Sequence, residues 1–487
     1  MRSRSNGLAA CLLLACVGCV GTPAVNGVPG VPPSSSVSWT PPREIRVRDS
    51  VAPPAIPADL EQRIRRLTLA EVVDLGLRNN PTTRLSWANA RAAAAAYGSA
   101  RGAYLPTIDG DVTATRLKTV ASQGRSAVTQ SVLSPSLNLS YLLFDFGGRS
   151  GTVGAARNAL VAADFTHNAT LQNVVLQIQA AYFQYIANRA LLQAQRITVR
   201  EAQTNLAAAE ERNRVGVATI ADVLQARTAA SQAELAAQAT EGDLQTSRGA
   251  LALSLGLPAN LPYEIDSTAA QAPVSVLADS VDVLIAHAVA ARPDLAAARA
   301  EYESSRDQIS VARANRLPSL ELNGTGGRTY TSSLPQGGNN YTLSLGLRIP
   351  LFAGFSRIYD QRQAAALADA AAARTDALGQ QVVFQVFSSY YALRTADRRV
   401  RTSEDLMASA QLSNDVALGR YKAGVGSVLD LLTAQSALAD ARAQQVMARL
   451  EWNSSLAQLA HDAGALDERG GSSLRLVPDS ASRTPPR

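Results

Sequence analysis

Apolar and polar residues alternate in two short stretches, residues 136–147 and residues 342–354. The apolar positions are Leu137, Leu139, Tyr141 and Leu143 in the first stretch, and Leu343, Leu345, Leu347, Ile349 and Leu351 in the second. Because side chains of a strand point alternately to opposite faces, this period of two predicts β-strands with one apolar face.

A partner strand is predicted before each of these stretches. Residues 107–116 and 319–328 show the same alternation more weakly. The Ser-, Gly- and Thr-rich segments at 122–130 and 332–340 are expected to be loops that join the partners. The sequence therefore predicts four strands in all.

Helical periodicity replaces this alternation in two long segments that contain no proline, Ser136–Leu257 and Leu351–Val477. Ala, Gln, Leu, Arg and Glu dominate both segments beyond their strands. A helix from about Thr152 to Asn213 would be roughly 90 Å long at 1.5 Å per residue. Helices of this length are typical of coiled coils and helical tubes.

The same order of elements occurs twice. Residues 77–106 match residues 289–318, and both segments predict a helix that ends at a Leu-Pro pair. The strands and long helices follow in each copy, so the chain is predicted to be an internal duplication. The predicted domains are a signal peptide (1–15), a linker (16–66), repeat 1 (67–258), an inter-repeat linker (259–280), repeat 2 (281–466) and a flexible C-terminal tail (467–487).

Each long helix is predicted to end in a tight turn. In repeat 1, Arg212 is followed by Gly216, Thr219 and Asp222. Their counterparts 208 positions later are Arg420, Gly424, Ser427 and Asp430. Glycine suits the left-handed residue that ends a helix, and Thr or Ser followed three residues later by Asp predicts a capping box for the next helix.

The N-terminus predicts export. Basic Arg2 and Arg4 precede a short apolar stretch, which is typical of a signal peptide and too short for a transmembrane helix. "LLLAC" predicts lipid attachment at Cys16, with Cys19 as the alternative acceptor. The other interpretation is an ordinary signal with incidental cysteines. A Pro-, Ser- and Gly-rich stretch then predicts an extended tether.

Little in the sequence indicates catalysis. The formal net charge of +6 is spread without a dense basic tract, so no nucleic-acid partner is expected. No cysteine occurs after Cys19, which excludes disulfides and thiolate metal sites from the body of the chain. His167, His287 and His461 are predicted to be ordinary helix residues. No catalytic set, cofactor or metal site is predicted, and the protein is not expected to be an enzyme.

Four strands are too few for a closed membrane barrel, which needs at least about eight. Three copies of the chain would supply twelve strands, and the same symmetry would assemble the long helices into a tube. A purely structural coiled-coil protein of the cell envelope is the remaining class, although it does not explain the alternating strands.

The motifs "FDFGGR" (144–149) and "LFAGFSR" (351–357) at the strand-to-helix junctions, together with the two turn motifs, resemble those of TolC-like outer membrane factors. These belong to the outer membrane efflux protein family, and the lipid-attachment motif resembles its lipoprotein branch, of which OprM is an example. The resemblance implies an α+β membrane protein. A homotrimeric 12-stranded β-barrel in the outer membrane would continue into a periplasmic α-helical barrel.

The same resemblance implies partners and site residues. A periplasmic adaptor would dock at the turns of Gly216 and Gly424 and link the channel to an inner-membrane pump. Asp430 would form a ring of three carboxylates at a periplasmic gate. Asp222 and Tyr421 would hold the closed state, although the family's basic partner falls at Gly426 here. The capping box explains both aspartates equally well.

The expected function is a passive exit duct in the outer membrane that conducts substrate from the pump and adaptor to the exterior. The sequence does not identify the cargo. Small-molecule efflux and type I protein secretion both remain open, and the coiled-coil scaffold is the less favoured alternative.

Overall fold

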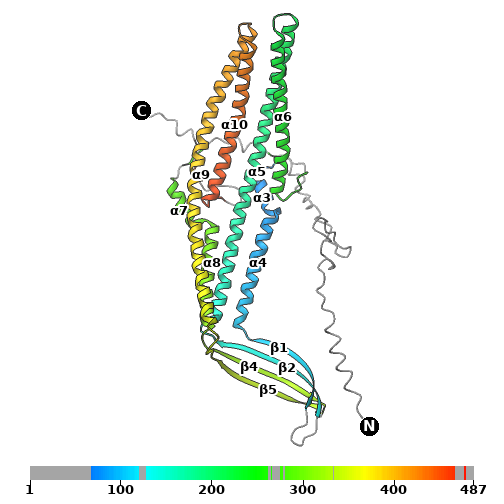
Figure 1. Ribbon diagram of the computed structural model, residues 1–487, viewed down its shortest axis with the longest axis vertical. Helices are drawn as coiled ribbons and strands as arrows, with labels where there is room; N and C mark the ends of the chain where they lie inside the picture. Colours follow the sequence, from blue (N-terminus) through cyan, green and yellow to red (C-terminus); the bar gives the residue numbers. More distant parts are fainter. Residues whose placement is uncertain are drawn as a thin grey trace, which may run out of the picture. The chain divides into compact units, whose positions relative to one another are not determined.

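The computed structural model describes residues 67–119, 128–260, 265, 275–277, 280–332, 334–466 and 476–478. Figure 1 shows the order of the elements along the chain. They are α3 (Leu69–Asn79), α4 (Pro81–Arg101), β1 (Thr107–Thr119), β2 (Val128–Phe144), α5 (Gly148–Arg214), α6 (Ile220–Ser254), β3 (Ser275–Leu277), α7 (Val281–Ala291), α8 (Pro293–Ala314), β4 (Ser319–Thr331), β5 (Leu334–Arg348), α9 (Ser356–Lys422), α10 (Val428–Asp462) and β6 (Leu476–Pro478).

The predicted duplication is confirmed by the lengths of the elements. Helices α5 and α9 each have 67 residues, and α6 and α10 each have 35. At 1.5 Å per residue the longer pair is about 100 Å long. Helix α5 begins at Gly148, four residues before the predicted start. No helix in the described ranges combines the length and hydrophobicity needed to cross a membrane.

Each long helix starts from a two-residue left-handed turn. Phe146 and Gly147 have φ of 50° and 94°, and their counterparts Gly354 and Phe355 have φ of 59° and 65°. Glycine adopts this conformation freely, whereas another residue is destabilised there by roughly 1–2 kcal/mol. Asp145 then caps α5, because its Oδ2 accepts a hydrogen bond of 2.6 Å from the backbone N–H of Arg149.

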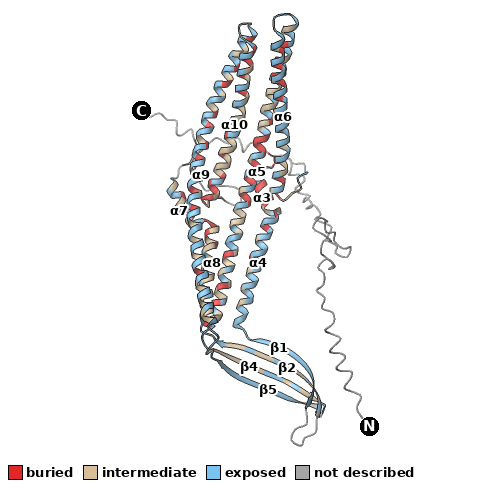
Figure 2. Ribbon diagram, in the orientation of Figure 1, coloured by how far each residue is buried: buried red, intermediate tan, exposed pale blue. Residues whose placement is uncertain are grey.

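The helices pack in pairs through seams of small residues. Ala202 of α5 packs with Ala230 and Ala233 of α6, and Ala410 of α9 packs with Leu438 and Ala441 of α10. Alanine permits close approach of the helix axes and has the highest helix propensity. Figure 2 shows the resulting buried stripe along the helices, while most residues of the sheet are exposed.

The four main strands form one antiparallel sheet in the order β1-β2-β4-β5. Cross-strand pairs such as Ile108 with Leu139 and Leu322 with Leu345 place the apolar residues on one face, as the alternation predicted. No other described element covers this face. Leu343, for example, is 70% exposed and Ile108 is 69% exposed. A single chain therefore leaves a broad apolar surface uncovered.

The strands differ from their predicted bounds. Strand β2 begins eight residues before the predicted stretch and includes Pro135, which lay just outside that stretch. The main chains of β2 and β4 approach closely here, because a Cβ at Gly327 of β4 would lie 2.5 Å from the carbonyl oxygen of Pro135. The main chains can approach closely only where the opposing residue has no side chain.

The predicted loop at 332–340 is also wrong. Residues 334–340 are the first part of β5, and this strand ends at Arg348 rather than at residue 354. The irregular backbone is confined to a bulge between Thr329 and Thr331 and to the left-handed Gly337 (φ 67°). Strands β4 and β5 remain paired on both sides of them. Residues 120–127 of the other predicted loop lie outside the described ranges, and Gln130 at its end belongs to β2.

Two short segments outside the main sheet are also paired. Strand β3, in the predicted inter-repeat linker, pairs antiparallel with β6, in the predicted C-terminal tail. Leu67 forms a parallel bridge with Ile265 of the same linker. The linker and the tail are therefore paired with each other at the residues of β3 and β6.

An ion pair of the buried Arg292 with the half-buried Asp294 connects the helices of repeat 2. Arg292, whose side chain is 7% exposed, contacts Asp294 at 2.6 Å. It also donates to the Gln385 side chain at 2.7 Å and to the backbone carbonyl of Asp462 at 3.3 Å. Burial raises the pKa of Asp294, but the hydrogen bonds and charge of Arg292, with smaller contributions from the Leu295 N–H and His461, outweigh it and leave that pKa lowered.

We expect Asp294→Asn to lower the free energy of unfolding at neutral pH by roughly 1.5–3 kcal/mol, because a charged hydrogen-bond partner of buried Arg292 is lost. A carboxylate with a lowered folded-state pKa stabilises the fold above the ordinary carboxylate range, and this contribution is lost as pH falls through the folded pKa. The difference between the two proteins should therefore shrink below about pH 4. Denaturant unfolding from pH 7 to pH 3 measures it, with the exposed Asp282→Asn as control. A difference that is independent of pH would contradict this assignment.

Candidate functional site

The turns that join α5 to α6 and α9 to α10 have the same hydrogen-bond pattern. The N–H groups of Gly216 and Val217 bond to the carbonyls of Asn213 and Arg212, at 3.0 and 2.9 Å. In repeat 2 the N–H groups of Gly424 and Val425 bond to Tyr421 and Arg420 at 3.1 and 3.0 Å. This is the Schellman motif, and the glycines have φ of 79° and 77°. The predicted helix-ending role of both glycines is confirmed.

Both turns are open on their outer side. A Cβ added at Gly216 or Gly424 would meet no atom of the chain within 4 Å. The neighbouring valines are exposed, with Val217 at 64% and Val425 at 69%. Each turn therefore presents a small apolar surface around a glycine backbone, which suits close approach by another protein segment.

The two turns differ in how they cap the following helix. Thr219 accepts from the N–H of Asp222 at 3.2 Å, and Asp222 Oδ2 accepts in return from the Thr219 N–H at 2.8 Å. In repeat 2, Ser427 Oγ accepts from the N–H of Asp430 at 3.1 Å, but the reciprocal bond is not formed. The predicted capping box is therefore confirmed for Asp222 and wrong for Asp430, whose exposed carboxylate takes no part in the cap.

Arg212 connects the two turns. Its Nη1 donates to the backbone carbonyl of Tyr421 at 2.9 Å, and its guanidinium lies 4.6 Å from the centre of the Tyr421 ring. Tyr421 itself is 7% exposed and packs on Val428 and Leu431. One arginine thus joins the end of α5 to the end of α9. Sequence analysis missed this contact, although the shared arginine of the two motifs was visible.

The predicted pair of Asp222 and Tyr421 is not joined in one chain. The Asp222 carboxylate bonds to the backbone and hydroxyl of Thr219, at 2.8 and 2.9 Å. The buried hydroxyl of Tyr421 has no hydrogen-bond partner among the described residues. Both residues nevertheless belong to neighbouring turns, because Arg212 beside the first turn contacts Tyr421 beside the second.

Gly426, where the resemblance implied a basic partner, has little room for a side chain. A Cβ there would lie 3.0 Å from Cβ of Arg420 and 3.1 Å from the backbone N of Tyr421. Its N–H also bonds to the carbonyl of Arg420 at 3.1 Å. The close packing explains why glycine stands at this position, and the cation beside Tyr421 is Arg212.

We expect Arg212→Met to loosen the turns without unfolding the helices. The variant keeps the apolar stem but loses a charged hydrogen bond and a cation–π contact, together worth about 1–2 kcal/mol. Amide hydrogen exchange at the two turns should therefore accelerate roughly five- to thirtyfold. The matched control is Arg420→Met, because Arg420 holds the equivalent position without a contact across the turns. Equal acceleration by both variants would show that Arg212 does not link the turns.

A second contact between the repeats lies further along the helices. Arg442 of α10 forms two parallel bonds with Glu201 of α5, at 2.8 and 3.0 Å, and the arginine side chain is only 14% exposed. Paired bonds of this kind fix orientation as well as distance. Together with Arg212 it fastens the α5–α6 hairpin to the α9–α10 hairpin.

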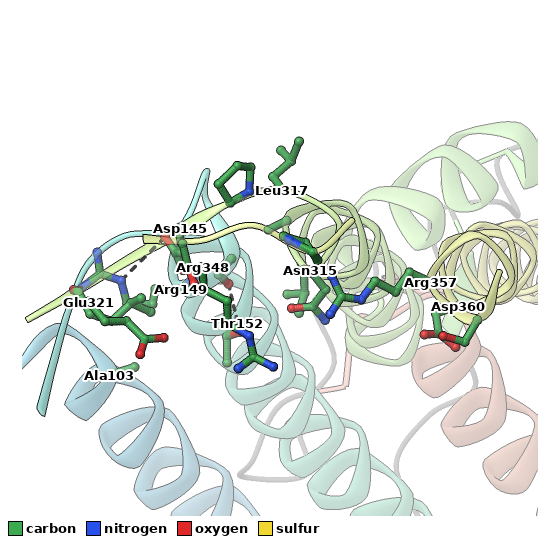
Figure 3. Close-up of a pocket in the computed structure, with 18 residues that line it drawn as sticks. Ala103, Asp145, Arg149, Thr152, Asn315, Leu317, Glu321, Arg348, Arg357 and Asp360 are labelled. Atoms are coloured by element: carbon green, nitrogen blue, oxygen red, sulfur yellow. Dashed lines mark hydrogen bonds and ion pairs between the residues drawn. The ribbon is translucent and has the colours of Figure 1, made fainter. Parts of the chain in front are cut away.

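Charged residues also gather where the strands meet the helices. Figure 3 shows them around a hollow of about 570 Å³ at the starts of α5 and α9. They are Asp145, Arg149, Glu321, Arg348, Arg357 and Asp360. Arg149 donates to the carbonyls of Leu142 and Leu143 at 2.5 and 3.0 Å, so it ties the last residues of β2 to α5. Acidic and basic residues are equal in number, which favours a structural junction.

Potential metal-binding and catalytic side chains do not cluster elsewhere among the described residues. Within the part of the chain that the structure describes, no group of three His, Cys, Asp or Glu could hold a metal ion. His167, His287 and His461 lie in helices α5, α7 and α10, as predicted. Each makes a hydrogen bond of 2.8 Å to a residue distant in sequence: His167 to Ser86, His287 to the carbonyl of Ala463, and His461 to Asn173. Cys16 and Cys19 lie outside the described residues.

Comparison with known proteins supplies the family. The model of the outer membrane efflux protein family matches residues 72–257 and 284–465. Protein CyaE of Bordetella pertussis is 29% identical over 421 residues, covering 83% of this chain and 88% of CyaE. Outer membrane protein TolC of Vibrio cholerae is 26% identical over 409 residues, covering 82% of this chain and 91% of TolC.

A solved structure shows the same fold. The crystal structure of a membrane protein from Pseudomonas aeruginosa superposes with a TM-score of 0.75 at 24% identity, over 81% of this chain and 93% of that chain. The two segments matched by the family model comprise more than half of the chain and include both turns and all four main strands. The chain belongs to the outer membrane efflux protein family.

Proposed function

We propose that this protein is the outer membrane exit duct of a tripartite export system, formed by three copies of the chain. The observation that carries the proposal is the sheet. Its apolar face is left uncovered by the described residues, and among them each edge strand, β1 or β5, is paired on one side only. Pairing β5 of one copy with β1 of the next would close a twelve-stranded barrel and remove every edge.

The duct would be passive. The sequence has no P-loop, so an inner-membrane pump would supply the energy and a periplasmic adaptor would join the two. We infer that the adaptor docks at the open turns of Gly216 and Gly424. We also infer that Asp430 forms the periplasmic gate, and that Asp222 and Tyr421 hold its closed state. Two observations support these assignments: both turns are exposed, and the Asp430 carboxylate is not used in capping α10.

Planar bilayer recordings test the proposal directly. The purified full-length protein should run as a trimer and give discrete conductance steps, because a closed barrel encloses an aqueous path. Absence of conductance from a well-folded trimer would favour the coiled-coil scaffold instead. The inner-membrane protein that co-purifies after cross-linking in cells would then distinguish small-molecule efflux from protein secretion.

We also propose that the mature chain begins at Cys16 and is lipid-anchored in the outer membrane. Cys16→Ser should remove the acyl chains, which mass spectrometry of the intact protein would register as loss of the lipid mass. Cys19→Ser is the matched control and should leave that mass in place. Because the barrel itself holds the protein in the membrane, conductance of the Cys16→Ser trimer should stay unchanged. Lipid retained on Cys16→Ser and lost from Cys19→Ser would assign the anchor to Cys19.

A further inference from the structure

The sheet separates its charges between its two faces. Cross-strand pairing places one set of residues on the face of Leu137 and Leu343, and another set on the opposite face. The described strands β1, β2, β4 and β5 carry their acids, Asp109, Asp111 and Glu321, only on the polar face. The apolar face carries Arg116, Lys118 and Arg328. Among the described strand residues, this face therefore carries cations and no acid.

These basic residues occupy one end of the apolar face. On β2 the apolar positions run from Leu143, beside the start of α5, to Leu133. Ten residues at about 3.4 Å and a strand tilt of about 40° give a height of roughly 26 Å, close to the lipid-facing band of membrane barrels. The next position on this face is Ser131, which pairs with Arg116, and Lys118 pairs with Thr129 beyond it. Arg116 and Lys118 thus lie where the apolar band ends, away from the helices. Arg328 lies just inside this end of the band, between the pairs Leu133–Tyr330 and Leu137–Gly326.

A hollow of about 420 Å³ lies at this boundary, lined by Arg116, Ser131, Leu133 and Tyr330 among others. The Arg328 guanidinium lies 5.3 Å from the ring of Tyr330. Arg116 and Lys118 are both exposed. Arg116 and the Tyr330 ring therefore line this hollow together with the exposed Leu133, and Arg328 lies beside that ring.

We propose that this surface, the basic rim (Arg116, Lys118, Arg328 and Tyr330), binds the phosphorylated headgroup of an anionic lipid in the outer leaflet of the outer membrane. The inference rests on the proposed function, which places the apolar band in that membrane with the helices on the periplasmic side. A phosphate would bind the cations while its acyl chains lie along the leucines below. The contiguous apolar band favours a lipid over a free anion, and three-fold symmetry would give three such sites.

The test uses full-length trimers in phosphatidylcholine nanodiscs titrated with diphosphorylated lipid A, with bound lipid counted by native mass spectrometry. The wild-type trimer should retain lipid A in preference to phosphatidylcholine. Each lost surface cation weakens binding to anionic lipid several-fold, so Arg116→Gln/Lys118→Gln should weaken retention by about tenfold or more. Arg116→Lys/Lys118→Arg should retain it, because the charge is preserved. The charge-matched control Arg200→Gln/Arg398→Gln removes two exposed helix cations and should match the wild type.

Three results would overturn the basic rim. One is equal retention by wild type and Arg116→Gln/Lys118→Gln. Another is undiminished retention of lipid A from which the phosphates have been removed. The third is displacement of bound lipid A by inorganic phosphate at a concentration equal to that of lipid A, which would indicate a simple anion site. A wild-type trimer that neither enters nanodiscs nor conducts would refute the exit duct itself, whereas one that conducts without preferring lipid A refutes only the basic rim.

Discussion

Replacing Gly424 with leucine is expected to abolish export while trimers still form and insert. At φ of 77° a leucine costs roughly 1–2 kcal/mol, too little to unfold a helix of 67 residues held by packing along its length. A Cβ at this position would meet no atom within 4 Å apart from the adjacent residues. The bulk of the leucine would therefore project from the turn into the space where the adaptor must approach. Gly216→Leu should act in the same way. Cross-linked trimers, adaptor co-purification and export by the complete system are the measurements.

Gly242→Leu provides the matched control for this prediction. Gly242 lies within α6, is exposed, and also has no atom within 4 Å of an added Cβ. The same bulk is thereby added away from the turns and at a position where leucine favours the helix. Loss of trimers in Gly424→Leu would mean that ending the helix is the dominant role of the glycine. Normal adaptor binding with normal export would refute docking at this turn.

Asp430→Asn should change the ion selectivity of the channel and weaken its block by divalent and trivalent cations. Three exposed carboxylates around a three-fold axis attract cations and raise their local concentration, and the amide removes that charge. The helix should be little affected, since the carboxylate of Asp430 takes no part in the cap and Ser427 supplies it. Bilayer recordings with added divalent or trivalent cations measure the block.

Asp222→Asn is the comparison that separates gate from cap. Its carboxylate closes a reciprocal capping box, so the amide should cost α6 roughly 0.5–1 kcal/mol. The expectation that capping treats the two aspartates alike was wrong, and the contrast is sharper as a result. Asp222→Asn should lower the thermal unfolding temperature, whereas Asp430→Asn should weaken the block by cations. Cation block that survives Asp430→Asn unchanged would place the constriction elsewhere.

The features predicted correctly from the sequence are those fixed by local chemistry. Gly216 and Gly424 end their helices because only glycine adopts the left-handed conformation without strain. Thr219 and Ser427 cap the next helices because their hydroxyls accept from the residue three positions on. The alternation of leucines likewise assigned the faces of β2 and β5, since the pleat alone sets which side chains share a face.

What could not be predicted depends on distant residues. At Pro135 in β2 the carbonyl oxygen is approached closely by Gly327 of β4, and nothing near Pro135 in sequence signals this contact. Arg212 contacts Tyr421 across 209 positions, whereas the equivalent Arg420 makes no such contact. The two motifs are alike in sequence, so only tertiary packing decides which arginine links the turns.

The equal lengths of α5 and α9, and of α6 and α10, restrict how this gene can change. One residue inserted into α5 alone would shift its turn by about 1.5 Å and rotate it by roughly 100°, carrying Arg212 away from Tyr421. An insertion is tolerable only when all four helices lengthen together, in steps near seven residues that restore the facing side after two turns. A duct of different reach therefore cannot arise from one insertion, and requires coordinated changes at four separate places in the same coding sequence.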